Sequence, residues 1–158
     1  MVKKIIKFII VLLCMTIIFM FSSDNGNQSN KKSDGVIMSV CKIFVHHNLT
    51  ESEKKHIINK YVVFVRKSAH FIIYLILGLS LISLIKEFRT VNWYSFIIAF
   101  IIAVLYACSD EIHQIFVSGR SAKVTDIIID GFGSFIGIYL YYILYKVRRK
   151  KIWVKKSN

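Results

Sequence analysis

Side chains able to carry out acid–base or metal chemistry cluster after one of the most apolar runs of the chain. Asp110, Glu111 and His113 stand within four positions, after the run FIIAFIIAVLYAC. Carboxylates and imidazoles this close together can transfer protons or hold a divalent metal ion, and they can also simply end a helix. The letters DEIH match a helicase box as well, but the chain has no G-x-x-x-x-G-K-[ST] phosphate loop, which excludes that function.

The composition places these side chains in a membrane protein. Apolar residue types make up 55% of the 158 residues, proline is absent, and the mean hydropathy is +0.55. Four apolar segments are long enough to cross a bilayer as helices: 5–21, 69–85, 93–109 and 127–145. The net charge of +13 would suggest nucleic acid in a soluble protein. Here the basic residues flank apolar segments, so we expect the lipid bilayer, and not nucleic acid, as the partner.

Basic residues also predict the orientation of the spans. Lysines and arginines gather in residues 1–4, in the connector 86–92 and in the tail 146–158, which holds seven of them. These three regions share one side if the spans alternate, and that side should be cytoplasmic. We therefore expect an all-α, single-domain, multi-pass protein of the cell membrane: residues 1–158 forming a bundle of four transmembrane helices, both termini cytoplasmic. The first segment also has the basic start and apolar core of a signal peptide, but no clean A-x-A cleavage site follows it.

The first outer loop divides into three parts. Residues 22–35 are rich in Asn, Ser and Lys, so we expect a flexible stretch. Residues 36–47 alternate in a way that predicts a short amphipathic helix on the membrane surface. Thr50 with Glu53 three positions later predicts a capping box that opens a further helix. Cys41 and Cys108 can lie on this same side of the membrane. The sequence therefore permits a disulfide between them but does not favour it.

Polar residues of all four spans should meet at the outer level. Ionisable residues at a membrane edge are expensive, which makes each of them a functional hypothesis. His70, Tyr74 and Gly78 share one helical face, and Asp126 and Asp130 share another. The candidate partners of Asp130 are His70, His113 and Arg120. In an ideal helix Asp110 and His113 face the bundle together, whereas Glu111 points toward a neighbour or the loop. The GxxxG pair Gly133 and Gly137 predicts close helix packing.

This convergence predicts a site with two kinds of residue. The candidates for catalysis are His70, Asp110, Glu111, His113, Asp126 and Asp130. The candidates for substrate binding are Arg66, Lys67, Tyr74, Gln114, Arg120, Ser22 and Ser23. One hypothesis is an enzyme that acts on a lipid-linked or headgroup substrate by acid–base chemistry or with a divalent metal, which the residues leave open. The alternatives are a non-catalytic protein that binds a precursor, lipid or antibiotic, a polar plug that only fixes helix packing, and a proton relay. The oligomeric state is open.

Three motifs resemble those of VanZ-like membrane proteins. RKSAHFIIYLILG at 66–78 is similar to R-K-x-A-H-F-x-x-Y-x-x-L-G, and DEIHQIFVSGR followed by DIIIDGFGSFIG is similar to the family's D-E-x-H-Q-x-F-V-P-G-R and the acidic, glycine-containing segment after it. FSSDNGNQS resembles the F-S-S-Q opening. The chain departs at Ser118, where proline is usual, and at Asp24, where glutamine is usual. The resemblance implies a small bacterial envelope protein, with a link to glycopeptide susceptibility, chiefly to teicoplanin, and no defined reaction.

Overall fold

The computed structural model describes the backbone of residues 1–44 and 49–157 and the side chains of residues 1–43 and 49–150. Within the described residues the chain is all-helical, with five helices and no strand. The helices are α1 (Val2–Ser23), α2 (Gly26–Phe44), α3 (Glu51–Ile85), α4 (Trp93–Ile115) and α5 (Val124–Ser157). Helices α1, α3, α4 and the part Val124–Lys150 of α5 are long and apolar enough to cross a membrane. The predicted all-α fold with four spans is confirmed, and each helix runs further than its apolar segment.

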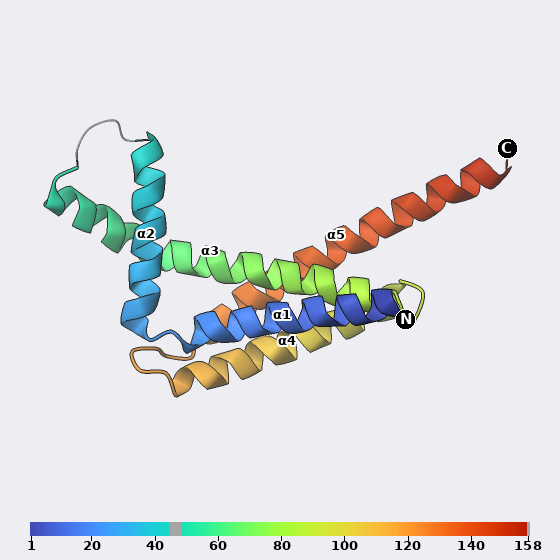
Figure 1. Cartoon of the computed structure of the whole chain (residues 1–158), viewed down its shortest axis with the longest axis horizontal. Helices are drawn as coiled ribbons and strands as arrows, with labels where there is room; N and C mark the ends of the chain where they lie inside the picture. Colours follow the sequence, from blue (N-terminus) through green and yellow to red (C-terminus); the bar gives the residue numbers. More distant parts are fainter. Residues whose placement is uncertain (45–48, 158) are drawn as a thin grey trace.

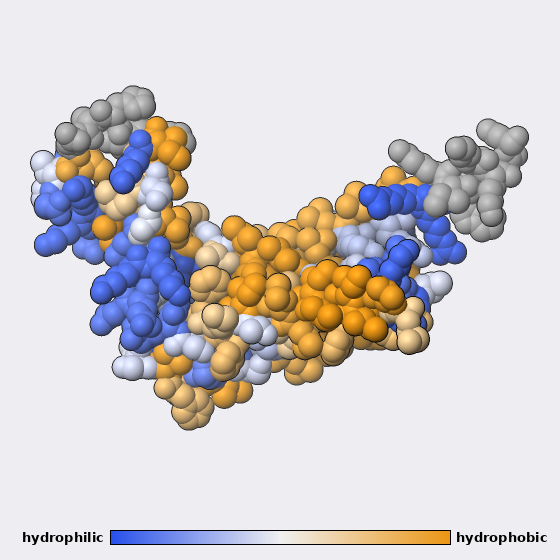
Figure 2. All heavy atoms as spheres, in the orientation of Figure 1, coloured by the Kyte–Doolittle hydropathy of each residue, from blue (hydrophilic) through white to orange (hydrophobic). Residues whose placement is uncertain are grey.

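The four long helices run alongside one another, and α2 lies across one end of them (Figure 1). The N-terminus, the α3–α4 connection and the C-terminal part of α5 lie toward the opposite end. Helix α3 is central, because it packs against α1, α2, α4 and α5. A broad apolar surface covers the middle of the molecule between two polar ends (Figure 2). Large exposed side chains such as Phe8, Leu13 and Leu144 belong to it, as expected of helices that face lipid.

Helix α2 corrects the prediction for the first loop. Residues 22–35 are not an irregular stretch, because α2 begins at Gly26. The Asn25 side chain accepts a hydrogen bond from the Gln28 backbone N–H at 2.8 Å, which satisfies a free donor of the first turn. The Gly26 N–H donates to the Ser118 carbonyl at 3.1 Å. Contact with the α4–α5 loop therefore stabilises a helix that the composition of residues 22–35 disfavours.

The predicted surface helix at 36–47 is thus the second half of α2, and its residues 45–47 lie outside the described part. The capping box at Thr50 is confirmed: Thr50 and Glu53 each bond the other's backbone N–H at the start of α3. The disulfide alternative is not formed, because Cys41 and Cys108 are both free.

Helices α3 and α5 meet at a seam of three glycines, Gly78, Gly133 and Gly137. A Cβ atom at Gly137 would collide with the Leu75 carbonyl oxygen, and Gly78 and Gly133 stand equally close to backbone of the facing helix. The GxxxG prediction is therefore confirmed, since only hydrogen in place of a side chain permits this approach. Near the seam the Ser134 hydroxyl donates to the Tyr74 carbonyl at 3.2 Å. This packing fixes the register between the polar residues of α3 and those of α5.

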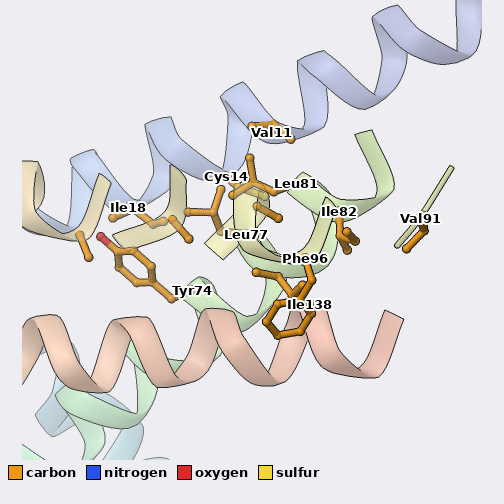
Figure 3. Close-up of a cluster of buried hydrophobic side chains, with 13 residues drawn as sticks. Val11, Cys14, Ile18, Tyr74, Leu77, Leu81, Ile82, Val91, Phe96 and Ile138 are labelled. Atoms are coloured by element: carbon orange, nitrogen blue, oxygen red, sulfur yellow. The ribbon is translucent and has the colours of Figure 1, made fainter. Parts of the chain in front are cut away.

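The apolar core runs along the bundle as far as Val91 in the α3–α4 connection. It is formed by side chains of α1, α3, α4 and α5, among them Ile18, Tyr74, Leu77 and Ile138 (Figure 3). The Tyr74 ring is fully buried, and its hydroxyl lies on the side of the ring away from Ile138 (Figure 3). That hydroxyl has no hydrogen-bond partner in the described residues. Tyr74 therefore closes the core below the polar residues and does not line the candidate site.

At the opposite end an ion pair joins α1 to the residues after α3. The Lys7 ammonium lies 2.5 Å from a Glu87 carboxylate oxygen and donates to the Ser83 carbonyl at 3.0 Å. The hydrogen bond from Lys7 holds the pKa of Glu87 below its usual range. The pair neutralises the charge that the sequence places within the first span.

We expect Glu87→Gln to cause a small loss of stability that depends on pH. A carboxyl group with a depressed folded pKa contributes stability above its unfolded pKa, about 4.3, and loses it as the pH falls through the lower folded value. Thermal unfolding in detergent should separate wild type from Glu87→Gln at pH 7 and bring them together near pH 3. A double-mutant cycle with Lys7→Gln and Glu87→Gln isolates the contribution of the ion pair. If wild type and Glu87→Gln differed in unfolding temperature by the same amount at both pH values, the ion pair would not be the cause.

Candidate functional site

A polar cavity of about 150 Å³ lies at the α2 end of the bundle, between α3, α5 and the loop after α4. Eight predicted site residues line it: Arg66, Lys67, His70, Glu111, Gln114, Arg120, Asp126 and Asp130. They come from three separate parts of the chain. The convergence expected from the sequence is therefore present for most of the predicted residues.

His70, Asp110 and Asp130 form the deepest part of the site. One ligand atom of each lies within 4.8 Å of the others, and His70 Nδ1 is 3.7 Å from an Asp130 carboxylate oxygen. Asp130 is completely buried, and Asp110 is 3% exposed. Of the three candidate partners of Asp130, His70 is the one that reaches it. The glycine seam explains this, because Gly133, three residues after Asp130, packs directly against the backbone of Phe71, the residue after His70.

The carboxylates of this group are poorly satisfied. Asp110 accepts from the Gln114 amide at 3.3 Å through one oxygen. Its other oxygen and both oxygens of Asp130 are buried without a hydrogen-bond partner in the described residues. Buried charges without partners are costly, so a proton or a cation must compensate them. His70, Asp110 and Asp130 are thus the residues that could hold a metal ion.

Glu111 faces the loop between α4 and α5, as its helical position predicts. One carboxylate oxygen accepts from the Lys123 backbone N–H at 2.8 Å. The other is buried without a partner in the described residues, although Glu111 also lines the cavity. Glu111 is therefore a carboxylate of the cavity wall with one unpaired oxygen, the type of group that can act as a general base.

His113 does not line the cavity; it faces the bundle, as expected, but at α1. Its Nε2 lies 3.1 Å from the Ser23 hydroxyl, and its ring packs 4.5 Å from that of Phe19. Three residues along a helix leave a 60° difference in direction, and here that difference turns His113 toward α1. Ser23 lies with it outside the cavity, and Ser22 is completely buried. His70 is therefore the only histidine among the described residues that lines this cavity.

The cations of the site differ in their availability. Lys67 pairs with Asp126 at 2.7 Å. Arg66 lines the cavity but makes no hydrogen bond or ion pair within the described residues. Its guanidinium is thus free to meet an anion.

Arg120 fixes the end of α1 against the site. Its Nε donates to the Asp24 carbonyl and its Nη2 to the Phe21 carbonyl, both at 2.8 Å. Its Nη1 donates to Gln114 at 3.3 Å. Burial lowers the pKa of Arg120, and the nearby Arg66 charge acts in the same direction. Arginine remains charged in proteins despite such a shift, so Arg120 combines structural bonding with a positive charge at the cavity.

An apolar groove of about 410 Å³ adjoins the polar cavity, between α1, α2 and α3. Side chains such as Ile18, Val36 and Ile73 line it. It shares Arg66, His70 and Arg120 with the cavity. Sequence reasoning missed this groove because one of its walls is the first half of α2, where a flexible stretch was expected.

Sequence reasoning also missed three cavity residues of the α4–α5 loop. They are Gly119, Ser121 and Lys123. Gly119 has φ +75°, a left-handed conformation that glycine adopts without strain, and it packs against Gly26. The available signal was the glycine next to Arg120, which marks a turn that folds the loop back over the site.

The comparisons with known proteins give one match. A family model described as VanZ/LLP1 matches residues 7–145. No curated protein and no solved structure matches the chain. The matched region includes two of the candidate spans entirely, most of the other two, and every residue that lines the cavity. The protein therefore belongs to the VanZ-like family of multi-pass membrane proteins.

Proposed function

We propose that this protein binds an anionic, lipid-linked substrate at the outer face of the cell membrane and acts on its headgroup. The headgroup occupies the polar cavity, and the hydrocarbon chain occupies the apolar groove. The observation that carries this proposal is the junction of the two spaces at Arg66, His70 and Arg120. A ligand that is polar at one end and apolar at the other fits such a pair of adjoining spaces.

The charges support an anionic headgroup. Arg66 is half-buried at the junction and has no acidic partner in the described residues. Arginine binds phosphate and carboxylate groups through two parallel hydrogen bonds. Lys67 can share its charge between Asp126 and a ligand. The shared recognition chemistry is therefore that of a phosphate or carboxylate on a lipid.

The polar groups support acid–base or metal-assisted chemistry rather than acyl transfer through a serine. His70, Asp130 and Glu111 line the cavity, and Asp110 has a ligand atom within 4.8 Å of those of His70 and Asp130. Ser121 lines the cavity too, but it has no hydrogen bond to a base in the described residues. A serine nucleophile needs such a base to be activated.

Binding can be tested with two lipids that differ only in the phosphate, dioleoyl phosphatidic acid and dioleoylglycerol. We expect the purified chain to prefer phosphatidic acid in native mass spectrometry. Arg66→Ala removes a charge-assisted hydrogen bond worth about 1.5–3 kcal/mol, so phosphatidic acid should bind roughly 10- to 100-fold more weakly. Ala69→Trp, which fills the groove, should weaken both lipids. Arg89→Ala at the opposite end is the matched control, and equal losses in Arg66→Ala and Arg89→Ala would refute the site.

A teicoplanin susceptibility assay in cells can distinguish a catalytic role from simple binding. The family's link to glycopeptide susceptibility leads us to expect that expression lowers the susceptibility of a sensitive bacterium to teicoplanin. His70→Gln should abolish this effect at equal membrane abundance if chemistry is needed. An unchanged effect would favour the alternative, a protein that only binds its lipid or the antibiotic.

The orientation follows the charges, since the end opposite the site carries the basic termini and connector. A cysteine-free variant carrying Ser121→Cys should react in intact cells with a maleimide that cannot cross membranes. The same background carrying Arg89→Cys should react only after the cells are opened. Labelling in the reverse pattern would place the site on the cytoplasmic side and rule out an outward-facing function.

A further inference from the structure

Three helices each contribute one metal-ligating side chain to a single buried point. His70 comes from α3, Asp110 from α4 and Asp130 from α5, and their ligand atoms lie within 4.8 Å of one another. The residues are far apart in sequence, and the packing of the bundle brings them together. We propose that His70, Asp110 and Asp130 bind one divalent metal ion.

The need for a cation comes from the buried oxygens. Both oxygens of Asp130 and one of Asp110 lack a hydrogen-bond partner in the described residues, although both side chains are more than nine-tenths buried. Two of the nearby cations are engaged elsewhere: Lys67 pairs with Asp126, and Arg120 donates to backbone carbonyls. Arg66 lines the same cavity but makes no ion pair with either carboxylate within the described residues. A divalent ion bound by two carboxylates and a neutral imidazole forms a group without net charge. Such a group removes most of the cost of burying two carboxylates.

The spacing fits an ion better than a direct contact. His70 Nδ1 and the Asp130 oxygen are 3.7 Å apart, beyond hydrogen-bonding range. Ligand atoms about 2.0–2.2 Å from a zinc ion stand roughly 3.0–3.6 Å from one another across its coordination sphere. Small movements therefore suffice to bind the ion. Two oxygens and one imidazole nitrogen suit a first-row ion such as Mn²⁺ or Zn²⁺ better than Ca²⁺, which prefers oxygen ligands alone.

The ion would also have an open side. His70 and Asp130 line the polar cavity, whereas Asp110 is buried and does not line it. Catalytic metal sites keep three protein ligands and leave a position for water or substrate. The inference shares its cavity with the proposed lipid site: a phosphate or carboxylate oxygen held by Arg66 would occupy that open position.

The test measures metal on the full-length chain and needs no substrate. The protein is purified in detergent without chelators, and its metal content is determined by mass spectrometry. We expect about one equivalent of Mn²⁺ or Zn²⁺ per chain, reduced at least ten-fold in Asp130→Asn, Asp110→Asn and His70→Gln. Asp126→Asn is the matched control, since it alters a carboxylate one turn away on the same helix that pairs with Lys67. It should keep its metal.

A second measurement uses the wild type alone, in case the variants fold poorly. A chelator should lower the thermal unfolding temperature, and added Mn²⁺ or Zn²⁺ should restore it, because an ion that binds only the folded state stabilises it. The inference is overturned if the wild type contains no metal and responds to neither ion, in which case the carboxyl groups carry protons. It is also overturned if Asp126→Asn loses metal as Asp130→Asn does. Lipid binding through Arg66 persists in either case, so failure here is distinct from failure of the lipid site.

Discussion

Replacing Gly137 by alanine is expected to destabilise the protein and to dismantle the candidate site together. A Cβ atom at this position would collide with the Leu75 carbonyl oxygen and press on the Leu79 backbone nitrogen. Neither is the end of a flexible side chain, so α3 and α5 must move apart. Overpacking of this kind costs about 1–3 kcal/mol. The cost falls on the pair of helices that carries His70 and Asp130.

The control for this prediction lies on the same helix. A Cβ atom at Gly131 would meet only a Val104 methyl group at 3.7 Å, an ordinary contact. Gly131→Ala therefore adds helix propensity, worth up to about 1 kcal/mol, without a collision. Thermal unfolding in detergent should rank Gly131→Ala at or above wild type and Gly137→Ala well below it. If the variants rank in the same order in phosphatidic acid binding, the packing at the glycine seam supports the site. If the two variants are equally stable, close packing at Gly137 is refuted.

The seam also shows why part of the site was predictable. GxxxG in a membrane span reports close packing, and the positions of His70 and Asp130 follow from helical spacing once α3 and α5 are packed in register. The close packing and the positions of these two residues each depend only on one helix and its neighbour. The contact of His113 with α1 depends on how α4 is rotated against α1, and no local pattern in the sequence encodes that rotation. The side of α4 that faces the site therefore became known only from the packing of the whole bundle.

The extent of α2 was unpredictable for a related reason. Its first half is polar and contains two glycines, so its helical propensity is low. The hydrogen bond from Gly26 to Ser118 and the backbone contact with Gly119 hold this half in place. These contacts join segments more than ninety residues apart. Because the apolar groove needs α2 as a wall, the groove was hidden from sequence reasoning as well.

The second large effect is expected at Arg120, where lysine should not replace arginine. Helix C-terminal carbonyls lack partners within the helix and attract positive charge. Arg120 satisfies the carbonyls of Phe21 and Asp24 at the end of α1 and also bonds Gln114. Each bond uses a different nitrogen atom of the guanidinium, which a single ammonium group cannot reproduce. Arg120→Lys should therefore leave at least one of the carbonyls unsatisfied.

Hydrogen bonds to charged groups contribute about 1.5–3 kcal/mol, so we expect Arg120→Lys to lower the free energy of unfolding by roughly that amount. Arg89→Lys, an exposed position at the other end, should have no effect and serves as the matched control. Arg120 also borders the groove, so release of α1 should weaken binding of phosphatidic acid and of dioleoylglycerol alike. Arg66→Ala should weaken the binding of phosphatidic acid alone and leave the free energy of unfolding unchanged. If Arg120→Lys instead behaved like Arg66→Ala, Arg120 would be a ligand for the headgroup alone and not the residue that holds α1 to the site.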